Sequence, residues 1–324
     1  MGFALKGAVA LIAAALLASF VDVGDAVARL GRLDPFYGLL TAGLVFLTHG
    51  VNALKLGLLL PERPTRALFV ATLATQAYTL LLPGQIAGEA AKAYRLGVGR
   101  KGQGDRIASS VMFDKLTGLI AGLVVTLAGL AGQGDHFGGE LAWLAGGALL
   151  GLAAAGGALT SHRVNAVLAR ALSGGDGAGD DGTGQGGGRL AGIRRWLAAR
   201  LDGFLATWRN HAGAPRLLAA SLIYGVAAQG LAVASAWTLA LGLGVDLPYG
   251  AWCVVIGALT VILLAPVTVG GLGVRELSLV GLLGLLDVPS DQALAVALMI
   301  LAFQLAVAVI GLAADLLTSH DDIS

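Results

Sequence analysis

The sequence predicts an all-α, polytopic integral membrane protein, and three observations carry this prediction. Of its 324 residues, 56% are hydrophobic and only 13% are charged, and the mean hydropathy is +0.81. Several apolar runs reach the roughly 20 residues that a helix needs to cross a bilayer. The 50 glycines favour close packing of helices in lipid. A soluble enzyme and a nucleic-acid-binding protein are therefore excluded, and no nucleic-acid partner is expected.

Eight apolar segments follow one another along the chain. Six of them predict complete spans, and these cover residues 4–21, 36–58, 109–131, 140–160, 215–242 and 292–317. The other two segments, at about 67–96 and about 251–286, are each interrupted by proline and glycine. Because proline breaks the hydrogen bonding of a helix, each of these two predicts a broken, re-entrant hairpin rather than one continuous helix.

The distribution of positive charge gives the orientation, because Lys and Arg are enriched in cytoplasmic loops. The segment 161–216 carries eight arginines, whereas the loops 132–139, 243–250 and 287–291 contain no Lys or Arg. Cations flank the first broken segment and acidic residues flank the second, so the two hairpins are expected to enter from opposite sides. We therefore expect a multi-pass protein in the cytoplasmic (inner) membrane of a prokaryote, with its N- and C-termini in the cytoplasm.

The same rule divides the chain into two inverted transmembrane repeats. The first comprises residues 1–131 and contains the hairpin at about 67–96. The second comprises residues 140–317, contains the hairpin at about 251–286, and is interrupted by the basic cytoplasmic loop 161–215. Inverted repeats with discontinuous helices are typical of transporters, in which the binding site lies near the midplane of the membrane.

The basic loop has two parts. Residues 173–188 are rich in Gly and Asp, which predicts a flexible linker; the alternative is a calcium site that uses Asp176, Asp180 and Asp181. Residues 189–210 place apolar side chains on one helical stripe with arginines around it. This pattern predicts an amphipathic helix, either on the anionic inner leaflet or packed on the protein's own cytoplasmic face. The stripe comprises Leu190, Ile193, Leu197, Leu201, Phe204 and Trp208.

The two breaks repeat one spacing. Pro83, Gly88 and Lys92 follow the pattern Pro-x4-Gly-x3-Lys, and Pro266, Gly271 and Arg275 follow it with Arg in place of Lys. Glycines at a break allow sharp turns, and a helix that starts there points the partial positive charge of its N-terminus towards the midplane. The residues that form the expected breaks are Pro83, Gly84, Gly88, Pro266, Gly270, Gly271 and Gly273.

Charged side chains in apolar segments are the candidate binding residues, because a charge at the bilayer centre costs roughly 2.5–3.5 kcal/mol. Lys92 and Arg275 at the two hairpins predict a receptor for a phosphate-like anion, and a lipid headgroup is the obvious source of one. The alternative is that each cation forms a local neutralising pair with the neighbouring glutamate. The candidate set for the headgroup phosphate is Arg275, Lys92, Glu276, Glu89, Lys115 and Asp114.

Other polar residues in the apolar segments are expected to form hydrogen bonds between helices. A polar path for a headgroup is the alternative. These residues are His49, Asn52, Lys55, Gln76, Tyr78, Gln229 and Gln304.

The sequence shows no catalytic constellation, P-loop or Gly-x-Gly-x-x-Gly, and its single cysteine, Cys253, excludes a disulfide framework. We therefore expect no enzymatic activity, no cofactor and no metal.

Three stretches resemble a known family. They are LLPGQIAGEAAKAYRL at 81–96, SSVMFDKLTGL at 109–119 and APVTVGGLGVRELSLVGLL at 265–283. They resemble the transmembrane, or flippase, region of lysylphosphatidylglycerol synthases, as a stand-alone member without the aminoacyltransferase domain. In this family the positions of Lys92 and Lys115 usually hold arginine. Lysine keeps the charge but loses the bidentate geometry of a guanidinium.

The resemblance implies translocation of a phospholipid, an aminoacyl-phospholipid or a polyprenyl-linked lipid, with the membrane lipid as the main partner. Two alternatives remain open at this stage. One is an intramembrane lipid-modifying transferase with Glu89 or Glu276 as base. The other is a non-catalytic partner that docks a lipid-synthesising enzyme through residues 189–210. The abundant small residues also allow a homodimer.

Overall fold

The computed structural model describes residues 33–81, 85–97, 102–132, 139–161, 201–264 and 273–317. Within these ranges every regular element is a helix, so the prediction of an all-α membrane protein is confirmed. The predicted span 4–21 and the linker 173–188 lie outside the described residues. So do five of the residues predicted at the breaks, namely Pro83, Gly84, Pro266, Gly270 and Gly271.

The helices follow the apolar segments of the sequence closely. They are α3 (Pro35–Leu59), α4 (Thr65–Leu81), α5 (Gln85–Gly97), α6 (Gly104–Ala131), α7 (Gly139–Thr160), α10 (Pro215–Gly242), α11 (Tyr249–Leu264), α12 (Val274–Gly284) and α13 (Ser290–Leu317). Four of them, α3, α6, α10 and α13, are long and apolar enough to cross a membrane. A helix of 28 residues, the length of α6, is about 42 Å long.

Helix ends lie where the sequence contains capping and helix-breaking residues. At the start of α3 the backbone N–H of Phe36 donates to the Asp34 carboxylate at 2.8 Å, and Pro35 occupies the first helical position. At the start of α12, Gly273 has a φ of 79°, a conformation that favours glycine. The expectation that helices start directly after the glycines of the two breaks therefore agrees with the first residues of α5 and α12.

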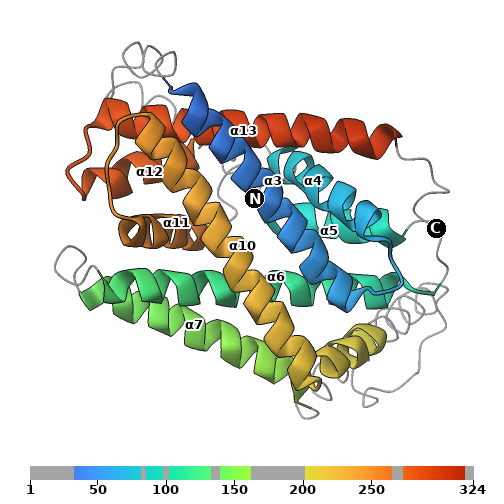
Figure 1. Ribbon diagram of the computed structural model, residues 1–324. Coiled ribbons are helices and arrows are strands. Elements are labelled where there is room, and N and C mark those ends of the chain that lie inside the picture. The colour runs from blue at the N-terminus through green and yellow to red at the C-terminus, as the bar shows by residue number, and fades with distance from the viewer. Residues whose placement is uncertain are drawn as a thin grey trace, which may run out of the picture.

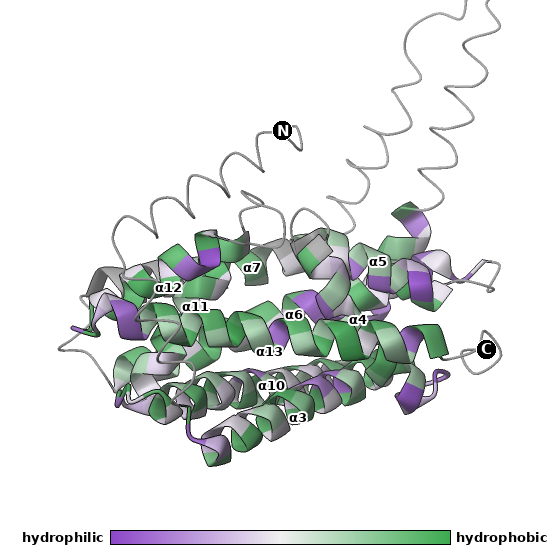
Figure 2. Cartoon of the chain, turned by 90° about the horizontal axis from the view of Figure 1, so that it is seen from above, coloured by the Kyte–Doolittle hydropathy of each residue, from purple (hydrophilic) through white to green (hydrophobic). Residues whose placement is uncertain are grey.

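The two pairs of short helices lie towards opposite ends of the molecule. In Figure 1, α4 and α5 lie to the right and α11 and α12 to the left, while α6, α7 and α13 run between the two ends and α3 packs alongside α10. Figure 2, viewed from above, agrees with this placement and shows that the helices are largely hydrophobic. The arrangement is compatible with hairpins that enter from opposite sides, and the inverted repeat stays a prediction.

Each pair of short helices packs in its own apolar cluster. Leu68 of α4 and Leu96 of α5 are buried with Leu56 of α3 and with residues of α6. Around α11 and α12, Trp252 and Leu279 are buried with residues of α10 and α13. The two regions therefore have separate apolar cores. The charged residues of each region lie beside a different core, so their environments differ.

Residues 201–212 are helical and pack on the protein itself. The side chain of Trp208 is 2% exposed, its ring lies edge-on to Phe113 of α6, and its Nε1 donates to the carbonyl of Gly156 in α7 at 3.1 Å. The described part of the predicted helix 189–210 thus adopts the second of the two expected arrangements. A contact with the anionic leaflet stays a prediction.

Candidate functional site

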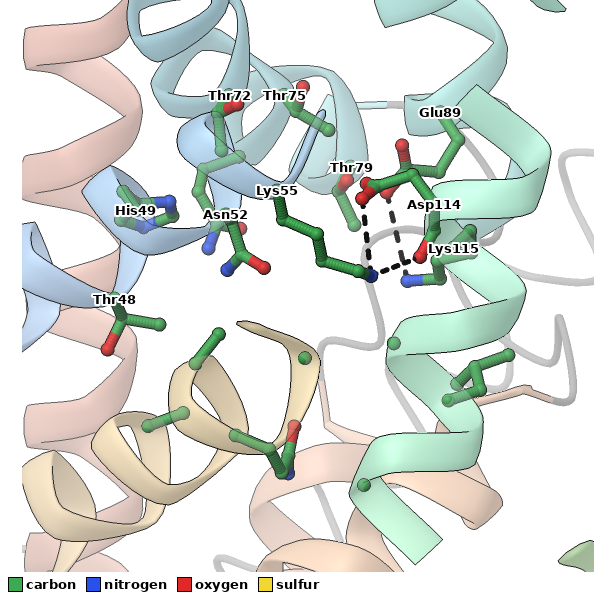
Figure 3. A pocket seen from close by; sticks show the side chains of 18 of the residues that line it. Thr48, His49, Asn52, Lys55, Thr72, Thr75, Thr79, Glu89, Asp114 and Lys115 are labelled. Atoms are coloured by element: carbon green, nitrogen blue, oxygen red, sulfur yellow. Dashed lines mark hydrogen bonds and ion pairs between the residues drawn. The ribbon is translucent and has the colours of Figure 1, made fainter. Parts of the chain in front are cut away.

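A cavity of about 340 Å³ lies among α3, α4, α5, α6 and α10. Figure 3 shows polar side chains from α3, α4, α5 and α6 that point into it. Its polar and charged lining comprises Thr48, His49, Asn52, Lys55, Thr72, Thr75, Gln76, Thr79, Glu89, Lys92, Asp114, Lys115, Gln229 and Thr260. A polar cavity inside a bundle of apolar helices needs a reason, because polar groups in lipid are costly unless they are paired.

Three lysines and two carboxylates meet at one end of this cavity. Lys55 Nζ lies 3.2 Å from Asp114 Oδ1, an ion pair drawn in Figure 3. Lys92 Nζ lies 2.6 Å from Glu89 Oε2 and 3.9 Å from Asp114 Oδ2. Lys115 Nζ lies 3.8 Å from Glu89 Oε1. We call these five residues the lysine cluster. Among the residues that the structure describes here, three ammonium groups face two carboxylates, so these five ionised side chains together carry one positive charge in excess.

Most of the lysine cluster is buried, and the Lys115 side chain at its edge is 27% exposed. Lys55 is 1% exposed and Lys92 is 4% exposed. Charges removed from water interact more strongly with one another and with any ligand, because the surrounding dielectric is low. An anion that enters the cavity would therefore neutralise the excess charge in a poorly screened environment.

Glycines give the helices the close approach that the cluster requires. A Cβ atom on Gly88 of α5 would lie 2.2 Å from Thr79 Oγ1 and 3.1 Å from the Thr79 backbone, so only glycine lets α5 pack this closely on α4. Gly88 lies inside helix α5, and its lack of a side chain permits the close contact of α5 with α4. Beside the Lys55 side chain, a Cβ on Gly118 would lie 3.3 Å from its Nζ and one on Gly225 would lie 3.7 Å from its Cε.

A second, smaller cavity, which has more apolar than polar lining residues, adjoins the first. It has a volume of about 110 Å³ and shares His49, Gln76 and Ala232 with the larger cavity. It extends along α3 to Thr41, fourteen residues before Lys55 and therefore about 21 Å away along the helix. His49 is buried, and its Nδ1 makes no hydrogen bond within the part of the chain that the structure describes. A water or a ligand group in the cavity would satisfy this nitrogen.

Comparison with known protein families gives a match for this chain. Residues 3–311 match the family described as the lysylphosphatidylglycerol synthase TM region. The chain belongs to this family. The match covers the described helices up to residue 311 within α13, so the predicted resemblance is confirmed, and the protein is a multi-pass membrane protein of a family associated with lipid flippase function. Comparisons with curated proteins and with solved structures gave no significant match.

The family stretches of this chain contribute to the site unequally. Those at 81–96 and 109–119 supply Glu89, Lys92, Asp114 and Lys115, and all four predicted residues line the larger cavity. Asp114 lies ten residues after the first residue of α6, about 15 Å along the helix. It therefore lies further from the start of the helix than the predicted start at residue 109 suggests.

The stretch at 265–283 provides no described residue to this lining. Arg275 and Glu276, in the first turn of α12, are each 4% exposed. The Glu276 carboxylate accepts from the backbone N–H of Gly273 at 2.6 Å and caps the helix, and Arg275 Nε lies 3.9 Å from Glu276 Oε1. The structure does not bring these two residues into the lysine cluster.

Lys55 is the site residue that sequence reasoning undervalued. Its helical spacing with His49 and Asn52 placed it on a polar face, and all three do line the larger cavity. A signal in the sequence identifies it, because a lysine inside a 25-residue apolar helix is costly without a partner.

Tyr78 has another role. Its hydroxyl lies 3.3 Å from Asp315 Oδ2, and the same carboxylate also binds Arg95 at 2.9 Å.

Proposed function

We propose that this protein translocates an anionic phospholipid between the leaflets of the membrane, and that the headgroup phosphate binds at the lysine cluster. The observation that carries the proposal is the excess of one positive charge, buried in a cavity among membrane-spanning helices. A lipid phosphate would complete the charge balance there, and the acyl chains need not leave the apolar environment.

The chemistry of lysine fits a site that must release its ligand. An ammonium binds phosphate as a point charge, without the bidentate geometry of arginine. Each ammonium of the lysine cluster is also held by a carboxylate, so a phosphate competes with Glu89 and Asp114 for the same cations. A site of this kind lowers the cost of bringing a charge into the membrane without trapping the lipid.

The smaller cavity supplies the next part of the path. In the proposed route the headgroup moves from the lysine cluster past His49 and Gln76 towards Thr41. On the predicted orientation this direction leads from the cytoplasmic to the outer leaflet. Movement of the two predicted repeats against each other would open the path alternately at its two ends. Aminoacyl-phospholipids and polyprenyl-linked phospholipids carry the required phosphate and belong to the same proposed substrate class.

The test is leaflet exchange of a fluorescent anionic lipid in proteoliposomes, with Lys115→Gln as the variant. This change removes the excess charge, while Lys92 still neutralises Glu89. Loss of one charged hydrogen bond is worth about 1.5–3 kcal/mol, so exchange should fall about tenfold or more. The control is Arg106→Gln, which removes a cation that pairs with Glu62 outside the cavity and should leave exchange unchanged. Equal exchange by the wild type and Lys115→Gln would contradict the proposal.

Analysis of the recovered lipid separates transport from catalysis. We propose that the lipid crosses without chemical change, so its mass should be the same before and after exchange. Glu89 lines the cavity, and a transferase that used it as base would instead release a lipid of altered mass when a donor is present. Such a product, absent in Glu89→Gln, would favour the enzymatic alternative.

A further inference from the structure

An apolar chamber adjoins the charged cavity. It has a volume of about 280 Å³ and lies among α6, α7 and α11. Among its described lining residues Thr260 has the single hydroxyl, and this hydroxyl donates to the Ile256 carbonyl at 2.8 Å, so it offers no free donor to a ligand. The chamber is lined by Leu119, Gly122, Leu123, Ala148, Gly151, Leu152, Gly257, Thr260 and Val261.

The chamber and the charged cavity share three lining residues, Leu119, Gly122 and Thr260. Gly122 is central to this junction, because it has no side chain to separate the two spaces. A Cβ atom added there would lie 3.5 Å from the Gln229 amide carbon, a residue of the charged cavity. A polar, positively charged space and an apolar space therefore meet across one turn of α6.

We propose that this chamber holds one acyl chain of the lipid whose phosphate binds at the lysine cluster, a step that rests on the proposed function. Apolar cavities stay dry, and one of about 150 Å³ already accepts a benzene-sized molecule. The chamber is larger and takes a longer hydrocarbon segment. Gly151 is exposed on α7, so a chain can enter from the surrounding bilayer.

The chamber raises affinity by positioning the lipid rather than by hydrophobic transfer. Lipid chains are as apolar as leucine side chains, so moving a chain from the bilayer into the protein gains little from the hydrophobic effect. A chain held there instead fixes the attached headgroup beside the lysines and reduces the freedom it loses on binding. The substrate class is therefore an anionic amphiphile with at least one long chain. A soluble phosphate lacks the group that the chamber recognises.

Gly151→Phe tests this assignment. Gly151 lines the chamber, and a Cβ atom there would have no neighbour within 4 Å, so the ring can occupy the chamber without displacing the backbone. The matched control is Gly147→Phe in the same helix. Position 147 also has no neighbour within 4 Å, but it does not line the chamber. Both purified variants are compared with the wild type for binding of a long-chain lysophosphatidylglycerol, its short-chain analogue and inorganic phosphate.

Gly151→Phe should weaken binding of the long-chain lipid about tenfold and remove the preference for it over the short-chain analogue. Phosphate binding should stay at the wild-type level, and Gly147→Phe should behave like the wild type throughout. If Gly151→Phe binds the long-chain lipid as Gly147→Phe does, the acyl chain lies elsewhere. Loss of phosphate binding in Lys115→Gln would still support the headgroup site, so the two proposals can fail separately.

A second measurement needs no variant. A lipid with a photoreactive group at the end of its acyl chain is crosslinked to the wild-type protein, and the labelled peptides are identified by mass spectrometry. Labelling of the chamber residues of α6, α7 and α11, reduced by excess unlabelled lipid, is the expected result. Labelling confined to the outer faces of α3 and α13 would overturn the assignment.

Discussion

The helix pair α4–α5 and the helix pair α11–α12 carry similar charges but use them differently. In α5, Glu89 and Lys92 meet charged side chains from α3 and α6 in a cavity. In α12, the Glu276 carboxylate turns back to cap its own helix and lies beside Arg275. The repeated spacing of proline, glycine and cation therefore does not imply the same role at both positions.

The difference arises from what packs against each pair. α5 packs on α6, which carries Asp114 and Lys115, and Lys55 of α3 reaches the same space. α12 packs on α11 and α13, where Trp252, Leu279 and Leu283 form part of an apolar cluster. A buried charge that faces other charges across an interface can bind a ligand. In α12 the buried Arg275 lies beside a carboxylate of its own helix, next to an apolar cluster.

The largest expected effect comes from breaking the pair in α12. Glu276→Leu removes the helix cap and leaves the Arg275 charge without its neighbouring carboxylate, which should reduce the free energy of unfolding by about 3–5 kcal/mol. The double variant Arg275→Leu/Glu276→Leu removes both charges and should recover most of this loss, because a buried ion pair can be replaced by apolar side chains at little cost. Thermal unfolding in detergent measures both.

Leaflet exchange by the same double variant sharpens the comparison. Neither side chain lines the charged cavity, so we expect the double variant to exchange lipid at the wild-type rate. A well-folded double variant that has lost exchange would place Arg275 in the lipid path, as the sequence alone predicts. An equally unstable double variant would show that the proximity of Arg275 and Glu276 does not explain the single variant.

A smaller effect distinguishes the glycines of the two pairs. Gly88→Ala forces a methyl group onto Thr79 of α4, and such overpacking should cost about 1–3 kcal/mol and reduce lipid exchange. Gly281 in α12 has no neighbour within 4 Å of an added Cβ. Gly281→Ala should therefore be neutral or stabilise the protein by up to about 1 kcal/mol, since alanine favours a helix over glycine. Equal melting temperatures for both variants would contradict the close contact of α4 with α5.

The sequence predicts the helices well because their boundaries are local. The run predicted at 215–242 is α10, Pro215–Gly242, since a proline starts it and a glycine ends it. The burial cost of charge also identifies Glu89, Lys92, Asp114 and Lys115, and the structure groups them. Spacing within one helix does not specify which helix lies opposite. For this reason the sequence predicts only a polar face for Lys55, and it predicts Arg275 at the site.

The smallest expected effect concerns the N-terminal part of α6, one turn before Asp114. The Ser110 hydroxyl lies 2.9 Å from His211 Nε2, and burial, together with the nearby Arg106 cation, lowers the pKa of His211. The unfolded chain therefore takes up a proton at a higher pH than the folded protein does. The contribution of His211 to stability is complete above its ordinary pKa of about 6.5 and declines as the pH falls below that value.

Thermal unfolding at about pH 7.5 and about pH 5.5 measures this contribution, because histidine titrates between these values. The wild type should lose more stability between the two conditions than His211→Gln, which cannot take up the proton. If this contact helps to position Asp114, acid should also slow lipid exchange more in the wild type than in His211→Gln. The double variant Arg275→Leu/Glu276→Leu is the control and should show the wild-type pH dependence, because it leaves both Ser110 and His211 in place. Identical pH dependence in the wild type and His211→Gln would exclude this histidine as the titrating group.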